Sequence, residues 1–571
     1  MTRNTARIIG SSVLAMGVLL LCTLPLFAQD NNTYLQHAVR FGISPRLDEL
    51  AKLPQAPQYG FHEANPVRRI PKRPIGPVVD TVEQRGAAPS ANYSIIANIL
   101  GVGNGFPNYS VPDAPPDTNM AVGDTQIVQW VNVSYTVCNK TTLVCGPAIA
   151  GNLIWSSLGG NCASNNAGDP IAQWDGVAHR WLLAQNFFSG NFGVCVAISQ
   201  TNDANGAYFL YQFPALNNGF PDYPKWGVWV NNYGQTWNNF GVGGGGFVGP
   251  VFCAYNRAKL LAGDNTAEQI CHQYPNNSPN FEDSLLPADI DLGPPPSGED
   301  QFAIGSLGDI DNTHVSLYSV HVTTSPFSAT FTGDNDSQLL SIANFTPSCH
   351  GSFGGACVPQ KGISDLADSL GDRMMYRFAY SNDVQGTSVP PCFTCTPPRF
   401  QHYLVNWDVE ASGGNIGPRW MELRAPESNV PVTSLTVFQQ GTYAPDGNWR
   451  WMGSLARDRM GNILLGYSVS CGSTCPGGTS GGVFPSVYIT GRTISDPPGT
   501  MEAETQVVGG AGSQPDTSNR WGDYSSMRLD TNDTLNGCTF WYTQEYYMVT
   551  QRFDWSTRIN SATFSNCTGG N

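Results

Sequence analysis

Aspartate recurs at the start of several predicted β-strands, next to basic and aromatic side chains. The repeated positions are Asp117 in PPDTNMAVG, Asp169 in GDPIAQW, Asp222 in PDYPKWGVW, Asp372 in LGDRMMYR and Asp523 in RWGDYSSM. Carboxyl groups bind sugar hydroxyls and act as acids, bases or nucleophiles. Glycoside hydrolysis needs two of them roughly 5 to 10 Å apart. The pattern therefore favours carbohydrate chemistry.

Cations and aromatic rings accompany these aspartates. Arginine can hold a uronic or sialic carboxylate with two hydrogen bonds, and aromatic faces stack on pyranose rings. We expect Asp372, Asp523 and Asp169 to be catalytic. The expected substrate-binding residues are Arg373, Arg520, Arg450, Lys225, Tyr524, Trp451, Asp117 and Asp222.

The same repetition has a second interpretation. An aspartate at one place in every repeat can hydrogen-bond the backbone and hold neighbouring repeats together. Repetition favours this structural role, because catalysis requires one or two special residues rather than one per repeat. Both interpretations stay open at the level of the sequence.

The elements that carry these residues are short alternating strands separated by Gly, Asn, Asp and Pro turns, which begin at about residue 96. Six strand groups open at the five aspartates and at Trp451, and a seventh, poorly marked group lies near residues 300–322. Four strands per group are typical of a propeller blade. We predict an all-β fold: a β-propeller of seven four-stranded blades, with six to eight as the range. Its inner strands would line a channel whose mouth holds the ligand.

Composition and the N-terminus indicate an exported protein. Residues 1–28 have a basic start and an apolar stretch, as in a signal peptide; residues 29–95 form a Pro-rich lead segment, and 96–571 form one propeller domain. No later segment is long and apolar enough to span a bilayer. Formal net charge is -15, which disfavours nucleic acid as a partner. We expect a monomer that is secreted, extracellular or periplasmic.

The cysteines support an oxidising compartment. Without Cys22, 14 of the 15 remain, an even number, and many lie close together in sequence. Proximity predicts seven disulfides: Cys138–Cys145, Cys162–Cys195, Cys253–Cys271, Cys349–Cys357, Cys392–Cys395, Cys471–Cys475 and Cys538–Cys567.

Two Asp-x-x-Gly turns, Asp203–Gly206 and Asp496–Gly499, resemble the Asp-box turn of sialidase-type propellers. The motifs quoted above, together with GTYAPDGNWRWMGS, resemble those of a group of uncharacterised secreted bacterial proteins of sialidase-like (BNR/Asp-box type) fold. The resemblance implies a secreted sialidase-like propeller, with no established reaction. Glu545, three residues after Tyr542, resembles the Tyr-Glu nucleophile pair of sialidases and is a fourth catalytic candidate. On a strand, however, these two side chains point to opposite faces.

The function predicted from these features is carbohydrate-active: a glycoside hydrolase or lyase acting on extracellular polysaccharide. The alternative is a non-catalytic propeller that binds glycan or protein at the cell surface. We expect no cofactor and no catalytic metal. Oxygen-rich loops at Asp530–Gly537 and Gly308–Asn312 offer a structural Ca²⁺ site, with plain hairpin turns as the competing interpretation.

Overall fold

The computed structural model describes most of the chain. The described residues are 1, 32–53, 62–63, 70, 76–188, 190–242, 245–276, 282–306, 311–333, 339–350, 355–382, 399–428, 430–471, 482–534 and 536–568. Predicted features outside these ranges are the signal segment up to residue 28, the Cys392–Cys395 pair and most of the Gly308–Asn312 loop.

The described strands form antiparallel units, each starting with an inner strand and ending at the outside. The first three units are β7 (Asn119–Val122), β8 (Gln126–Val131), β9 (Ser134–Asn139) and β10 (Ile149–Ala150); β11 (Ile171–Asp175), β12 (Arg180–Phe187), β13 (Gly193–Ser199) and β14 (Tyr208–Pro214); and β15 (Phe220–Val228), β16 (Asn232–Phe240), β17 (Phe247–Asn256) and β18 (Glu268–Gln273).

The next two units share one continuous sheet, because β19 and β26 pair in parallel. They are β19 (Asp283–Leu292), β20 (Gln301–Ser306), β21 (His314–Thr324) and β22 (Phe327–Thr332), and β26 (Met374–Asn382), β27 (Phe400–Glu410), β28 (Ile416–Pro426) and β29 (Thr436–Tyr443).

The last two units follow without a break in the pattern. They are β30 (Trp449–Arg457), β31 (Ile463–Ser470), β32 (Ser486–Arg492) and β33 (Thr505–Val508), and β34 (Ser526–Asp530), β35 (Thr539–Tyr546), β36 (Ser556–Phe564) and β5 (Tyr93–Leu100).

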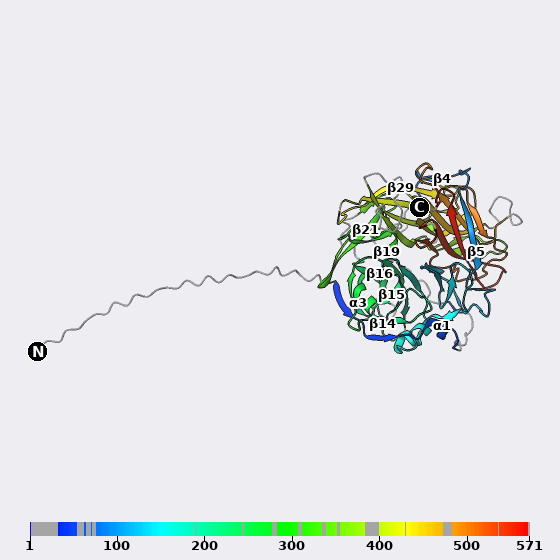
Figure 1. Cartoon of the computed structure of the whole chain (residues 1–571). Coiled ribbons are helices and arrows are strands. Elements are labelled where there is room, and N and C mark those ends of the chain that lie inside the picture. The colour runs from blue at the N-terminus through cyan, green and yellow to red at the C-terminus, as the bar shows by residue number, and fades with distance from the viewer. Residues whose placement is uncertain are drawn as a thin grey trace.

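The first strands of successive units contact one another, and β34 contacts β7, so these inner strands close a ring. Figure 1 shows the chain passing round the molecule, from cyan at the bottom through green at the left and yellow at the top to red at the right. The all-β propeller fold is confirmed. Because two of the units share a sheet, the number of blades stays a prediction.

Ring closure uses a strand from near the N-terminus. β5 pairs along its length with β36, so the last unit takes its outer strand from residues 93–100 (Figure 1). β36 (Ser556–Phe564) is the strand that receives β5.

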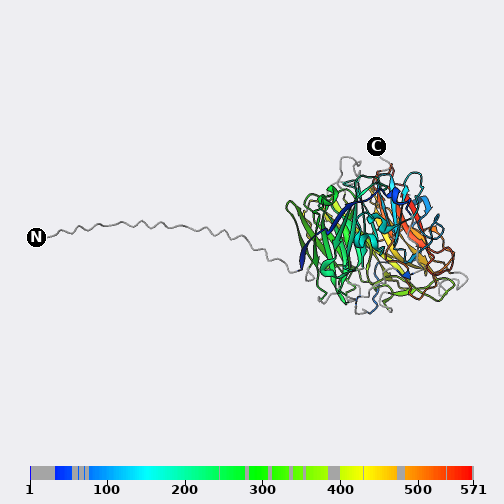
Figure 2. The same cartoon turned by 90° about the horizontal axis from the view of Figure 1, so that it is seen from below.

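Short strands from the lead segment lie on the outside of the units. β1 (Thr33–His37) pairs with β18, β2 (Arg40–Ile43) with β14, and β4 (Glu83–Gln84) with β29. In the turned view the dark-blue segment runs along the green strands (Figure 2). The lead segment therefore supplies edge strands, while the predicted domain boundary at residue 96 stays a prediction.

The fourth unit begins earlier than the sequence suggested. Its inner strand β19 starts at Asp283, and residues 300–322 supply the second and third strands instead. The opening "EDSLLPAD" lacks the Gly-Asp or Pro-Asp pair found at the five other aspartates, so its aspartate was overlooked.

Large aromatic residues fill the space between neighbouring sheets. Trp130, Trp181, Trp226, Trp451 and Trp521 are all fully buried. Wide rings suit this position because adjacent twisted sheets diverge toward the outside and need bulky side chains to pack without voids.

Five of the seven predicted disulfides lie in described residues and all five are confirmed. They are Cys138–Cys145, Cys162–Cys195, Cys253–Cys271, Cys349–Cys357 and Cys538–Cys567. Cys471 is also disulfide-bonded, while residue 475, its predicted partner, lies outside the described residues. Disulfides of this number are consistent with an extracellular protein.

Candidate functional site

Three of the five repeated aspartates converge at one end of the channel. One carboxylate oxygen from each of Asp117, Asp169 and Asp523 lies within 4.8 Å of the others. Each residue stands a few positions before an inner strand, β7, β11 or β34, and these strands are neighbours in the ring. Asp117 and Asp169 have positive φ angles of 43° and 48°, a conformation that non-glycine residues adopt only when the surroundings hold them in it.

Glu545 lies beside this group. It is on β35, and neither of its side-chain oxygens has a hydrogen-bond partner among the residues that the structure describes, although Glu545 is 1% exposed. A Cβ atom added to Gly522 would lie 3.3 Å from Glu545 Oε1 and 3.8 Å from Asp117 Oδ1. The two carboxyl groups therefore flank the space that glycine leaves open in the RWGDY motif. We call Asp117, Asp169, Asp523 and Glu545 the acidic cluster.

Burial sets the charge state of the acidic cluster. It raises the pKa of Asp117, Asp169 and Glu545 well above the usual range. Asp523 raises the pKa of Asp117 and Asp169 further, and Asp117 raises that of Glu545. A buried carboxyl group that stays protonated near neutral pH is suited to donate a proton.

Two cations accompany the cluster. Arg520 forms an ion pair with Asp523, three residues away. The Lys225 ammonium donates to the carbonyl of Pro224 at 3.1 Å and lies over the rings of Tyr223 and Tyr524, 3.2 Å and 4.4 Å from their centroids. Burial lowers the pKa of Lys225 to about 7, against the opposing effect of the nearby aspartates. Lys225 is thus suited to exchange a proton near neutral pH.

The remaining predicted residues lie around the cluster or away from it. Asp372 pairs with its own neighbour Arg373, whose guanidinium lies 4.8 Å from the Tyr223 ring centroid on the edge of the site. Asp222 is buried near Asp169 and raises the pKa of that carboxyl. These residues border the acidic cluster without joining the group of three oxygens.

Arg450 and Trp451 interact with residues outside the acidic cluster. Arg450 forms ion pairs with Glu504 at 2.7 Å and Asp446 at 2.8 Å. Trp451 is fully buried against Trp521, with ring centroids 5.2 Å apart. Trp226 and Trp521 are buried as well, so these indoles pack between units and do not form an exposed stacking surface. Among the aromatic candidates, Tyr524 lies nearest the acidic cluster, through its contact with Lys225.

A second buried charged group lies further along the inner strands and was not identified from the sequence. Arg377 forms ion pairs with Asp289 at 2.9 Å and with Asp291 at 2.7 Å, and Arg528 pairs with Asp289 at 2.6 Å. We call Asp289, Asp291, Arg377 and Arg528 the paired network. Its charges balance, two against two, which suits a structural role.

In the loop at Asp530–Gly537, the carboxylates of Asp530 and Asp533 bind other groups of the protein. Asp530 pairs with Lys140 at 2.9 Å. Asp533 accepts hydrogen bonds from the backbone N–H groups of Gly537, Cys538 and Thr539. These contacts favour the hairpin-turn interpretation over a calcium loop at this position.

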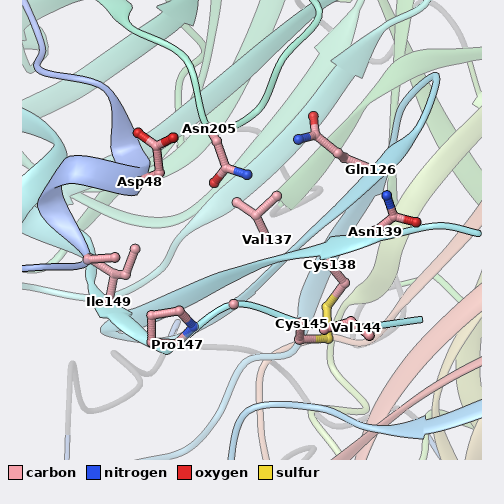
Figure 3. A pocket seen from close by; sticks show the side chains of 12 residues that line it. Asp48, Gln126, Val137, Cys138, Asn139, Val144, Cys145, Pro147, Ile149 and Asn205 are labelled. Carbon is pink, nitrogen blue, oxygen red and sulfur yellow. A yellow bond between two sulfur atoms is a disulfide. The ribbon is translucent and has the colours of Figure 1, made fainter. Parts of the chain in front are cut away.

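A separate pocket of about 380 Å³ lies on the outside of the first unit. Figure 3 shows Asp48, Asn205 and Gln126 along one side and the Cys138–Cys145 disulfide on the other. Asp48 is its sole carboxylate, and a hydrogen bond from Arg46 holds its pKa below the usual range. With one paired acid, this pocket is less suited to acid–base chemistry than the acidic cluster.

Comparison with known proteins gives no family. No family model matches the chain, and no curated protein matches it. The solved structures that resemble it include Drosophila Semaphorin 1b extracellular domains 1-2 (8% identity, TM-score 0.33, 84% of this chain and 88% of that one) and the phage phi92 endosialidase (8%, 0.35, 82% and 69%). The WD40 domain of SCAP from fission yeast is a third (8%, 0.32, 83% and 98%). The strand pairing and the ring of inner strands establish the propeller fold.

The short helices of the structure are α1 (Leu47–Leu50), α2 (Gly160–Ser164) and α3 (Arg257–Ala262). Within the described ranges, no helix has the length and apolar character required to cross a bilayer.

Proposed function

We propose that this protein is a carbohydrate-active propeller that cleaves polysaccharide at the acidic cluster. The observation that carries the proposal is the buried Glu545 beside the convergent Asp117, Asp169 and Asp523. The aspartate oxygens lie within 4.8 Å of one another, so the proposed catalytic pair is Glu545 with one aspartate rather than two of the aspartates. Close carboxyl groups of unequal basicity are what glycosidic bond cleavage uses, because the leaving oxygen must be protonated as its bond breaks.

Glu545 is the proposed proton donor. It is buried and has no hydrogen-bond partner among the described residues, and burial raises its pKa well above the usual range, so it holds its proton to higher pH than an exposed glutamate does. Protonation of the leaving oxygen is common to hydrolysis and to elimination, so this assignment holds for a hydrolase and for a lyase. The second group differs: an aspartate would serve hydrolysis, whereas Lys225 would abstract a proton in elimination.

One observation favours the alternative of a non-catalytic, glycan-binding propeller. Asp117 Oδ1 accepts the backbone N–H of Asp523 at 2.7 Å and so ties the first unit to the last. This contact is the structural role that repetition of aspartate favours. This hydrogen bond involves one oxygen of Asp117. It does not give Asp169 or Glu545 a structural role.

The test is a screen of the full chain against neutral and uronic-acid polysaccharides. Reducing ends report hydrolysis or elimination, and ultraviolet absorbance of the unsaturated sugar reports elimination alone. We expect release by the wild type and a loss of at least 100-fold in Glu545→Gln, the range of acid–base catalysis. The matched control is Asp458→Asn, a buried carboxyl in the β30–β31 turn bonded to Asn462, which should keep full activity.

Two outcomes would contradict the proposal. Full activity of Glu545→Gln would place the chemistry elsewhere. Retention of a polysaccharide on an affinity gel, with no release from any substrate, would support the binding alternative instead.

A further inference from the structure

We propose that Asp117, Asp169 and Asp523 bind a calcium ion at the end of the propeller channel. This inference goes beyond the proposed function, because the binding of the ion is measured without any sugar.

The spacing of the three aspartates fits one shared cation. Calcium binds oxygen at 2.3–2.6 Å, so two oxygens on the same ion lie at most about 5 Å apart. The three carboxylate oxygens lie within 4.8 Å of one another. Magnesium, at 2.0–2.1 Å, requires oxygens within about 4.2 Å and a nearly regular octahedron, whereas calcium accepts more variable geometry.

An independent feature points to the same place. Glu545 is almost completely buried, and neither of its carboxyl oxygens has a hydrogen-bond partner. Its Oε1 faces the space beside Gly522 that Asp117 Oδ1 also faces. Buried polar groups are normally satisfied, and an unsatisfied one calls for a partner such as an ion or an ordered water. A water bound to a calcium ion next to Asp117 provides that partner without making Glu545 a ligand of the ion.

In the acidic cluster, carboxyl groups outnumber the cations beside them. Four carboxyl groups gather here, and each is at most 5% exposed. Arg520 pairs with Asp523, and the Lys225 ammonium is held over two tyrosine rings and at the Pro224 carbonyl. In the paired network, by contrast, two arginines meet two aspartates. A divalent cation would displace the protons of the coordinating carboxyl groups and balance the charge that remains.

Calcium would change how the site works. With the aspartates coordinating the ion, Glu545 and Lys225 remain as the groups that move protons, which favours elimination over hydrolysis. Open coordination positions on the ion would bind sugar hydroxyls or a uronic carboxylate, which three bare aspartates would repel.

The experiment is calorimetric titration of the chelator-treated full chain with CaCl₂, and in parallel with MgCl₂. We expect calcium binding in the wild type, an affinity at least tenfold lower in Asp169→Asn, and no change in the control Asp458→Asn. Circular dichroism checks that each variant is folded. Should Asp169→Asn fail to fold, Asp523→Asn replaces it, and the rise of the wild-type unfolding temperature with CaCl₂ is measured as well.

The inference is overturned if the folded wild type binds no calcium, or if Asp169→Asn binds it with wild-type affinity. Calcium binding without polysaccharide cleavage would leave this inference standing and contradict the proposed function. Cleavage by a wild-type protein that binds no calcium would support the proposed function and contradict this inference.

Discussion

The acidic cluster and the paired network are both buried at the inner strands, but they differ in how many cations pair with their carboxyl groups. In the paired network Arg377 and Arg528 neutralise Asp289 and Asp291 through direct ion pairs. The pKa of Asp289 is consequently lowered: burial opposes its charge, and the two arginines outweigh that effect. The pKa of Asp291 is raised, because burial outweighs its ion pair with Arg377. In the acidic cluster, burial and neighbouring carboxylates together raise the pKa values of Asp117, Asp169 and Glu545.

This difference separates a stabilising arrangement from one that costs stability. A buried charge with a well-placed partner is tolerated, whereas carboxyl groups crowded together without enough cations are unfavourable unless they serve a purpose. Strain and unmet charge concentrate at functional sites. The paired network therefore suits a role in the framework, and the acidic cluster is the place where we propose that the protein acts.

The largest expected effect comes from breaking the paired network. Arg377→Met removes the partner of Asp291 and one partner of Asp289, leaving buried carboxylates uncompensated. We expect a loss of about 3–5 kcal/mol in the free energy of unfolding, measured by urea denaturation. Arg46→Met is the matched control: its ion pairs with Asp48 and Asp203 are exposed, so a much smaller loss in the free energy of unfolding is expected. Equal losses in the two variants would refute the assigned role of the network.

Stability measured at several pH values tests how burial alone, without repulsion from other carboxylates, raises the pKa of a carboxyl group. Asp408 is a buried carboxyl whose pKa is raised to about 8 by burial, opposed by a hydrogen bond from the Met452 N–H. Because its folded pKa lies above its unfolded value, the folded state holds the proton longer. Stability should therefore fall as pH rises from about 4 to about 8, by up to about 1.4 kcal/mol per pKa unit.

Asp408→Asn should remove that part of the pH dependence, so the variant and the wild type are compared by urea unfolding at several pH values. A difference between them that does not grow with pH would show that Asp408 is not protonated in the folded protein.

The smallest effect expected is that of Gly522→Ala. The new Cβ would lie 3.3 Å from Glu545 Oε1, so the carboxyl group must shift by a few tenths of an ångström. We expect less than about 1 kcal/mol of destabilisation, and a several-fold loss of calcium affinity or cleavage. Gly246→Ala, where no atom lies within 4 Å of the new Cβ, is the control. Unchanged calcium affinity and cleavage in Gly522→Ala would show that Glu545 does not act together with the aspartates of the acidic cluster.

The sequence predicted the features that depend on local pattern. Alternating strands with polar turns gave the all-β propeller, and short cysteine spacings gave the five observed disulfides. Aspartate at the starts of the inner strands identified Asp117, Asp169 and Asp523, because repeated positions in a ring of similar units come to the same end of the channel.

The pattern did not reveal which repeated residues meet. Asp372 turns to its neighbour Arg373, and Arg450 to Glu504, since side-chain direction is decided by packing between units. The paired network was missed because its partners are distant in sequence: Arg377 lies 88 residues from Asp289, and Arg528 lies 239 residues from it. Such pairs become visible only when the ring is closed.

The most direct test neutralises one carboxylate in each region and compares the free energies of unfolding in the presence of a chelator. Asp169→Asn removes repulsion from the acidic cluster, so the variant should be at least as stable as the wild type. Asp289→Asn takes a partner from Arg377 and Arg528 and should cost on the order of 3 kcal/mol. A loss in Asp169→Asn as large as that in Asp289→Asn would contradict the account, because the acidic cluster would then be as structural as the paired network.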